Sequence, residues 1–90
     1  MVHTSIDTTK ETRKVDKILR HYGVKCMLQQ DVVVKPEDEL IPMFFIGNGI
    51  WYKTKLSKMI CNDKKVLKEY VKHRILDAMK RIAKDKRNTI

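Results

Sequence analysis

The residues best suited to act on a ligand lie in residues 50–58 (IWYKTKLSK), where aromatic side chains are interleaved with lysines. On a β-strand, Trp51, Lys53 and Lys55 would share one face, because successive side chains alternate between faces. Exposed rings stack on bases and ammonium groups hold phosphates, which is what single-stranded nucleic acid requires. The alternative is that Trp51 completes a small core and the lysines form a solvated edge that discourages aggregation.

A second candidate surface is the polar face of a helix expected over residues 64–84. Residues 62–90 hold ten Lys and Arg against four acids, so they carry +6 of the formal net charge of +9. Such a face attracts phosphates without reading bases, although Glu69 and Asp77 interrupt it. The alternative is an ordinary solvated face on a packing helix. The two surfaces together give the predicted nucleic-acid-binding residues Trp51, Lys53, Lys55, Lys58, Lys72, Lys80, Arg81 and Lys84.

The sequence offers no comparable pattern for catalysis or metal binding. It lacks the Gly-rich phosphate loops G-x-x-x-x-G-K-[ST] and G-x-G-x-x-G. Its histidines and cysteines form no close pair of the C-x-x-C or H-x-x-x-H kind that structural zinc sites show. We therefore predict a non-enzymatic protein with no cofactor and no metal.

Composition sets the class of protein. Ninety residues make one domain with a modest core, and the excess of Lys and Arg favours polyanionic partners. The first residues do not have the pattern of a signal peptide, and no apolar run approaches the roughly 20 residues of a membrane span, so we expect a cytoplasmic protein without a membrane partner. Cys26 and Cys61 are expected to be free thiols in a reducing compartment, with one disulfide between them as the alternative.

Hydrophobic spacing predicts the elements that must position these residues. Apolar residues at helical spacing predict a helix over residues 9–22, with Thr8 and Glu11 as a capping box, an Asp16–Arg20 pair and Gly23 ending the helix. Residues 24–35 read as extended, with 32–34 (VVV) the strongest strand signal. Residues 43–46 and 50–53 flank a three-residue loop and predict a hairpin, which Pro42 opens and whose second strand could run to residue 61. Asn62 and Asp63 precede the long helix as its cap.

These elements predict an α+β fold in the order α-β-β-β-α, with two helices packed on one face of a small antiparallel sheet. Residues 1–90 would form one domain, with 1–7 and 86–90 frayed. The expected core is Val15, Ile18, Leu19, Val33, Phe44, Ile46, Leu67, Tyr70, Val71, Ile75, Met79 and Ile82.

Two functions from different classes follow. The first is a basic protein that contacts DNA or RNA largely non-specifically through the residues listed above. The second is a protein-interaction module, such as an inhibitor, adaptor or self-associating subunit of viral or mobile-element origin. It would use the apolar stripe of the long helix and residues 44–46, which are apolar on both faces.

Overall fold

The computed structural model describes residues 9–88, and they form an α+β fold, as the sequence predicts. The first helix is α1 (Lys10–Leu19), which ends in a short turn of 3-10 helix, η2 (Arg20–Tyr22). Three strands follow: β1 (Lys25–Leu28), β2 (Leu40–Gly47) and β3 (Ile50–Ser57). The chain then runs through α2 (Lys58–Asn62), α3 (Lys64–Tyr70), the π-helical segment η3 (Val71–Leu76) and α4 (Asp77–Asn88).

The three strands form one antiparallel sheet with β2 in the centre. Gly47 pairs with Ile50, so the hairpin loop has two residues and not the three that the sequence suggested. Both loop residues have positive φ, 51° at Asn48 and 76° at Gly49. This is the backbone that a tight hairpin needs to match the twist of its strands, and Asn-Gly adopts it readily.

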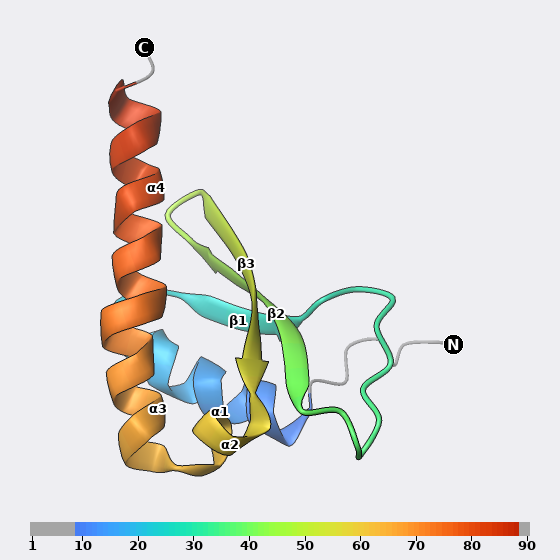
Figure 1. The fold of residues 1–90 in the computed structure, drawn as a ribbon. Helices are drawn as coiled ribbons and strands as arrows, with labels where there is room; N and C mark the ends of the chain where they lie inside the picture. The colour runs from blue at the N-terminus through green and yellow to red at the C-terminus, as the bar shows by residue number, and fades with distance from the viewer. Residues whose placement is uncertain (1–8, 89–90) are drawn as a thin grey trace.

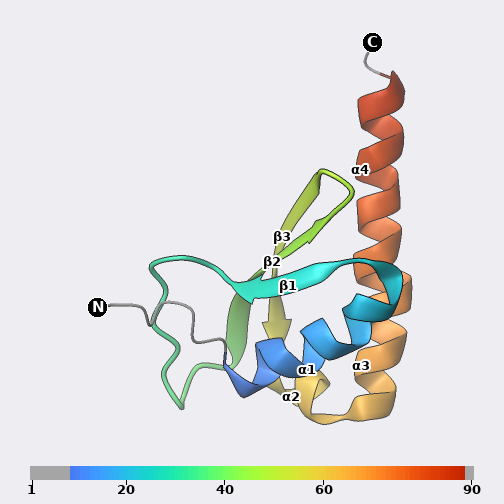
Figure 2. The same ribbon diagram turned by 180° about the vertical axis from the view of Figure 1, so that it is seen from behind.

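The helices lie against one face of this sheet. α1 packs beside β1, and α4 passes the β2–β3 hairpin, where the Lys86 ammonium donates to the carbonyl of Gly49 at 3.4 Å. Figure 1 and, from behind, Figure 2 show α3, η3 and α4 as one long helical rod, with α1 lying across its lower part. The predicted helix over 64–84 is therefore confirmed but too short, because helix continues to Asn88.

Alternate residues of the strands fill the core beneath the sheet. Ile41, Met43 and Phe45 of β2 are fully buried, and they face a row of helix side chains spaced one turn apart. The predicted core was right for Val15, Leu19, Leu67, Val71, Ile75 and Met79, which are buried, while Ile18, Tyr70 and Ile82 pack against the core half-buried. The core prediction was wrong for Phe44 and Ile46, which lie on the opposite face of β2. The run of residues 40–46 is apolar throughout, so the sequence does not show which alternate residues face inward.

The second error concerns residues 29–39, which form a long loop. β1 ends at Leu28, and Asp31 takes a left-handed conformation (φ 61°) that turns the chain away from the sheet. The predicted strand over 32–34 is therefore absent, and Val33 is 80% exposed while Val34 packs against the core. A high β-propensity means only that a residue fits well in a sheet. The turn before the three valines leaves them with no strand alongside, so their propensity does not make them a strand.

The ends of the hairpin strands also differ from the prediction. Pro42 lies inside β2, where Gln29 donates to its carbonyl at 3.3 Å. Its missing N–H costs little, because β1 has already ended at the Leu28–Met43 pair. β3 stops at Ser57, whose hydroxyl accepts from the N–H of Met59, so the strand does not run on to residue 61.

Capping residues define where the helices begin and end. Thr9 caps α1, accepting from the N–H of Thr12 at 3.3 Å, whereas the predicted cap Thr8 lies outside the described residues. The Asp63 carboxylate caps α3 through the N–H groups of Lys65 and Val66, as predicted. Gly23 adopts φ 71° after η2, also as predicted.

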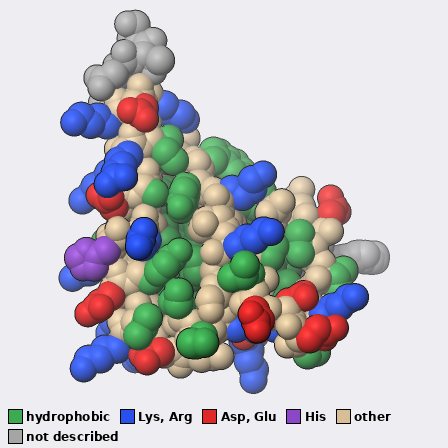
Figure 3. Space-filling model, in the orientation of Figure 1, with side chains coloured by type: hydrophobic (Ala, Val, Ile, Leu, Met, Phe, Trp, Pro, Cys, Tyr) green, Lys and Arg blue, Asp and Glu red, His purple; other side chains and the backbone are tan. Residues whose placement is uncertain are grey.

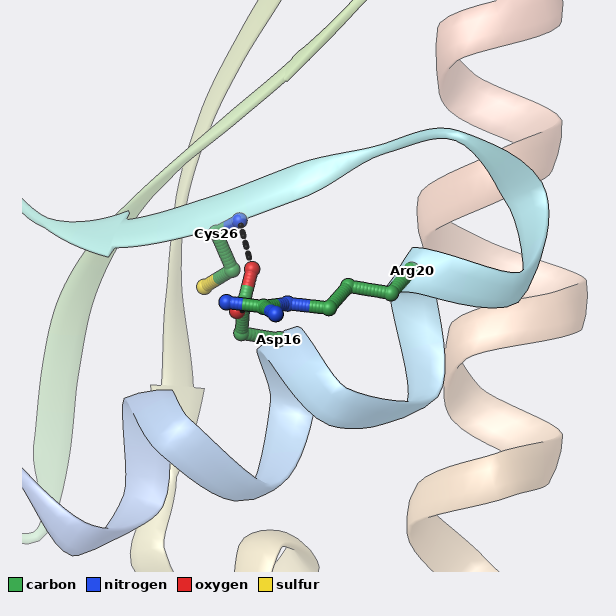
Figure 4. Close-up of polar contacts among 3 residues, drawn as sticks. All are labelled: Asp16, Arg20 and Cys26. Carbon is green, nitrogen blue, oxygen red and sulfur yellow. Dashed lines mark hydrogen bonds and ion pairs between the residues drawn. The ribbon is translucent and has the colours of Figure 1, made fainter.

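One side chain closes the free edge of β1. The Asp16 carboxylate of α1 accepts from the backbone N–H of Cys26 at 2.8 Å and pairs with Arg20 at 2.8 Å, as Figure 4 shows. An edge strand leaves alternate N–H groups unpaired, and here a charged acceptor satisfies one of them. Asp16, expected to form only a surface pair with Arg20, therefore also fastens α1 to the sheet.

Candidate nucleic-acid interface

The face of the sheet turned away from the helices carries aromatic, aliphatic and cationic side chains. We call it the open sheet face. It consists of the strand residues whose neighbours in sequence point into the core, namely Lys25, Met27, Leu40, Pro42, Phe44, Ile46, Trp51, Lys53, Lys55 and Ser57. None of these residues is buried, whereas Ile41, Met43, Phe45 and Leu56 on the other face are fully buried.

Trp51 is the most exposed aromatic residue of this face and lies on the edge strand β3 beside the hairpin loop. It is 61% exposed, pairs across the strands with Ile46, and presents its ring edge-on to Phe44 with centroids 6.1 Å apart and planes at 84°. The sequence left the direction of Trp51 open, and the structure shows that it points outward. An exposed indole held by an edge-to-face contact is a surface on which a flat group can stack.

Three lysines share the open sheet face with these rings. The Lys53 ammonium lies 5.8 Å from the centre of the Phe44 ring, and Lys55 is the next residue on the same side of β3. Lys25 lies across the sheet, paired with Ile46. The face holds no Asp or Glu, so no carboxylate of this face offsets the charge of its three lysines. Trp51, Lys53 and Lys55 thus share one exposed face, as alternation along the strand predicts.

Lys58, predicted to act with these residues on the sheet, lies elsewhere. It begins α2, and its ammonium donates to the carbonyls of Lys35 and Pro36 at 3.0 Å each. These bonds attach the end of the 29–39 loop to the helix, so Lys58 has a structural role. β3 ends at Ser57, and even a longer strand would have turned residue 58 to the face opposite Trp51, Lys53 and Lys55.

The predicted helix cations form two separate groups. Lys80, Arg81 and Lys84 are exposed on α4, where Arg81 pairs with Asp77 at 3.0 Å. Lys72 instead lines a hollow between α1 and α3 together with Lys17, Lys64 and Lys68. In the orientation of Figure 1, the space-filling view shows Lys and Arg along the outer side of the long helical rod and hydrophobic side chains between the rod and the sheet (Figure 3).

Lys25 and Phe44 are the two members of the open sheet face missed by sequence reasoning that bear most on binding. Lys25 begins a strand of only four residues, and nothing in the sequence shows that it pairs beside Ile46. Phe44 was placed in the core. One signal could have placed Phe44 correctly. Alternation in β3 turns Lys53 outward, and directly opposite residues of paired strands point to the same face, so Phe44 must also face outward.

The two thiols are free, buried and poorly suited to nucleophilic chemistry. Burial, followed by the nearby Asp16 carboxylate, raises the pKa of Cys26 far above its ordinary value of 9.0. Burial and then Glu11 raise the pKa of Cys61 to about 11. Both thiols are therefore protonated near neutral pH, and a protonated thiol is a weak nucleophile.

Among residues 9–88, no three or more His, Cys, Asp or Glu side chains come together as a metal site would require. None of the helices in that range is both long and apolar enough to cross a membrane.

Comparison with known proteins identifies no relative. No protein-family model, no curated protein and no solved structure matches the chain. Function must therefore be argued from the surfaces of the molecule alone.

Proposed function

We propose that the protein binds single-stranded nucleic acid, largely independently of sequence, on the open sheet face. The observation that carries this proposal is the outward-facing Trp51, whose ring lies beside that of Phe44, with the Lys53 ammonium 5.8 Å from the centre of the Phe44 ring. A small domain gains most from burying its only tryptophan. A base stacked on this indole would bury the ring surface that the fold leaves exposed.

The geometry supports a track along β3. Same-face side chains on a strand are about 7 Å apart, so Trp51, Lys53 and Lys55 form a regular row. A base would stack on Trp51 while the two ammonium groups meet the phosphates of the following nucleotides. Lys25, at the other side of the sheet, would hold the strand as it leaves the aromatic pair.

The same face favours single strands and little sequence preference. Stacking on a side chain needs an unpaired base, whose ring is covered by its neighbours in a duplex. The open sheet face carries no Arg, Asn or Gln, whose planar side chains read base edges by paired hydrogen bonds. The exposed cations of α4 would add a non-specific attraction that salt screens.

Anisotropy of a labelled 12-nucleotide single strand tests the proposal. Trp51→Ala should weaken binding about 5- to 150-fold, because stacking contributes about 1–3 kcal/mol per base. Met59→Ala is the matched control, since Met59 is 81% exposed on α2 and lies outside the open sheet face. Equal affinities of the two variants would refute the proposal, as would equal or tighter binding to a duplex of the same length.

A pair of charge variants tests the lysines separately. Lys53→Ala with Lys55→Ala should weaken binding more than Lys80→Ala with Lys84→Ala, although both remove two charges. If the two double variants bind equally, the attraction comes from net charge alone and the track along β3 is wrong.

A protein-interaction module is the second candidate function, and exposed hydrophobic side chains support it. Met59 is 81% exposed and Val66 44% exposed, and Figure 3 shows hydrophobic side chains reaching the surface between the helical rod and the sheet. Pull-down with and without nuclease separates the two candidates. Partners that survive nuclease treatment favour this one, and partners released by nuclease favour nucleic acid.

A further inference from the structure

A second surface lies between α1 and α3, on the helical side of the molecule. Two adjoining hollows of about 460 and 330 Å³ follow the line where these helices meet. We call them together the lysine-rimmed groove, which is lined by Lys14, Lys17, Ile18, His21, Tyr22, Cys61, Asn62, Lys64, Leu67, Lys68, Glu69 and Lys72. None of these residues belongs to the open sheet face, so the groove is a separate surface.

The rims of the groove are cationic on both sides. Lys64, Lys68 and Lys72 follow one another at intervals of four residues along α3 and η3, and Lys14 and Lys17 face them from α1. Glu69 is the one acid among the lining residues, and Lys14 donates to the Asn62 side chain at 3.1 Å. Like charges one turn apart repel each other, and a bound anionic group between the rows would relieve that repulsion.

The floor of the groove is apolar. Ile18 is half-buried, Leu67 is buried at 1% exposed, and Tyr22 at 45% exposed lies beside them. An apolar floor between two cationic rims is complementary to a helix that carries an apolar stripe flanked by carboxylates. Such a helix would rest against two helices at once, burying its stripe on Ile18 and Tyr22.

Two other occupants fit this surface less well. A nucleic-acid backbone would pair with the lysines but would leave the apolar floor uncovered. A second copy of the chain would bring another net charge of +9 against rows of lysines, and like-charge contact disfavours assembly. Charge complementarity and the apolar floor together select an acidic amphipathic partner.

We propose that the lysine-rimmed groove docks an acidic amphipathic helix of a partner protein. The lysines on the two helices set the direction of the docked helix, and the apolar floor sets how closely it approaches the domain. This interaction is independent of nucleic-acid binding on the open sheet face, because the two surfaces share no residue. The protein would then be able to hold a nucleic-acid strand and a protein partner at the same time.

A designed peptide tests the groove directly. The probe is an 18-residue helical peptide with leucines at i, i+3, i+4 and i+7 and glutamates beside them, compared with a scrambled peptide of identical composition. In 0.15 M salt, amide chemical-shift mapping should place the ordered peptide on Ile18, Tyr22, Lys64 and Lys68. Equal binding of the scrambled peptide, or shifts centred on Trp51 and Lys53, would overturn the proposal.

Matched charge reversals make the test specific. Lys64→Glu with Lys68→Glu should weaken peptide binding about tenfold or more, while Lys80→Glu with Lys84→Glu changes net charge equally and should have less than about a threefold effect. Tyr22→Ser, at an exposed position, should weaken binding without unfolding the domain. Equal effects of the two double reversals would overturn the proposal.

The groove proposal can fail or succeed independently of the function proposed for the sheet. Trp51→Ala should leave peptide affinity unchanged, so failure of nucleic-acid binding would not affect the groove. If a single-stranded oligonucleotide displaces the peptide competitively, the groove is a nucleic-acid site and the assignment to a protein helix is wrong.

Discussion

Replacing Asp16 by alanine tests how the sheet and α1 are held together. The variant removes the acceptor of the Cys26 N–H at 2.8 Å and the ion pair with Arg20. A partly buried N–H left without a partner costs about 1–3 kcal/mol, and an exposed i,i+4 pair contributes about 0.3–0.5 kcal/mol. We expect the free energy of unfolding to fall by about 1.3–3.5 kcal/mol, from a total of roughly 5–10 kcal/mol for a domain of this size.

Urea unfolding followed by circular dichroism measures this loss, and the melting temperature should fall by roughly 5–28 °C. Arg20→Ala is the matched control, because it removes the ion pair and leaves the bond to Cys26. It should cost no more than about 0.5 kcal/mol. If Arg20→Ala and Asp16→Ala destabilise equally, the bond to the edge strand contributes nothing and the reasoning is refuted.

Three other predictions concern the core, the hairpin loop and a thiol. Phe45→Ala should cost about 3–5 kcal/mol in urea unfolding, and Phe44→Ala much less, because Phe45 is fully buried and Phe44 lies on the open sheet face; equal losses would contradict the assigned faces. Gly49→Ala should cost about 1 kcal/mol through its positive φ of 76° alone, since an added Cβ meets no atom within 4 Å; an unchanged urea midpoint would contradict this. Burial raises the pKa of Cys61 from 9.0 in the unfolded chain to about 11 in the fold, so its stabilising effect is present below pH 9 and lost as pH rises toward 11. Stability measured at pH 8 and pH 10 should therefore fall less in Cys61→Ala than in the unmodified protein, and an equal fall would contradict the shift.

The helices could be predicted from the sequence because their apolar residues repeat at helical spacing. Val15 and Leu19 in α1, and Leu67, Val71, Ile75 and Met79 in the helical rod, all reach the core that this spacing predicts. Thr9, one residue after the predicted cap, and Asp63 supply the caps. Local side-chain chemistry fixes such features, so tertiary packing had little to change.

The sheet was harder to predict because its strands depend on partners distant in sequence. Residues 40–46 are uniformly apolar, so nothing local shows that Phe45 faces inward and Phe44 outward. Residues 32–34 have strong strand propensity but no strand beside them. β1, with only four residues, is held by Asp16 and by its pairing with β2, and neither contact is visible along the chain.

The candidate surfaces show the same difference: features within one element could be predicted, and features shared between elements could not. Alternation along β3 correctly placed Trp51, Lys53 and Lys55 together, because all three belong to one element. Lys72 was grouped with the cations of α4, yet it lines a groove completed by α1. A site built from two elements depends on how they pack, which helical spacing alone does not reveal.

Fluorescence of Trp51, the only tryptophan of the chain, tests the central claim most directly. Titration with a short single-stranded oligonucleotide should quench the emission to saturation, because the base stacks on the indole. The logarithm of the affinity should fall with the logarithm of salt concentration with a slope of about −2, given about three phosphates held by Lys25, Lys53 and Lys55. Emission that stays unchanged while anisotropy reports binding would contradict the account, since the nucleic acid would then lie away from the open sheet face.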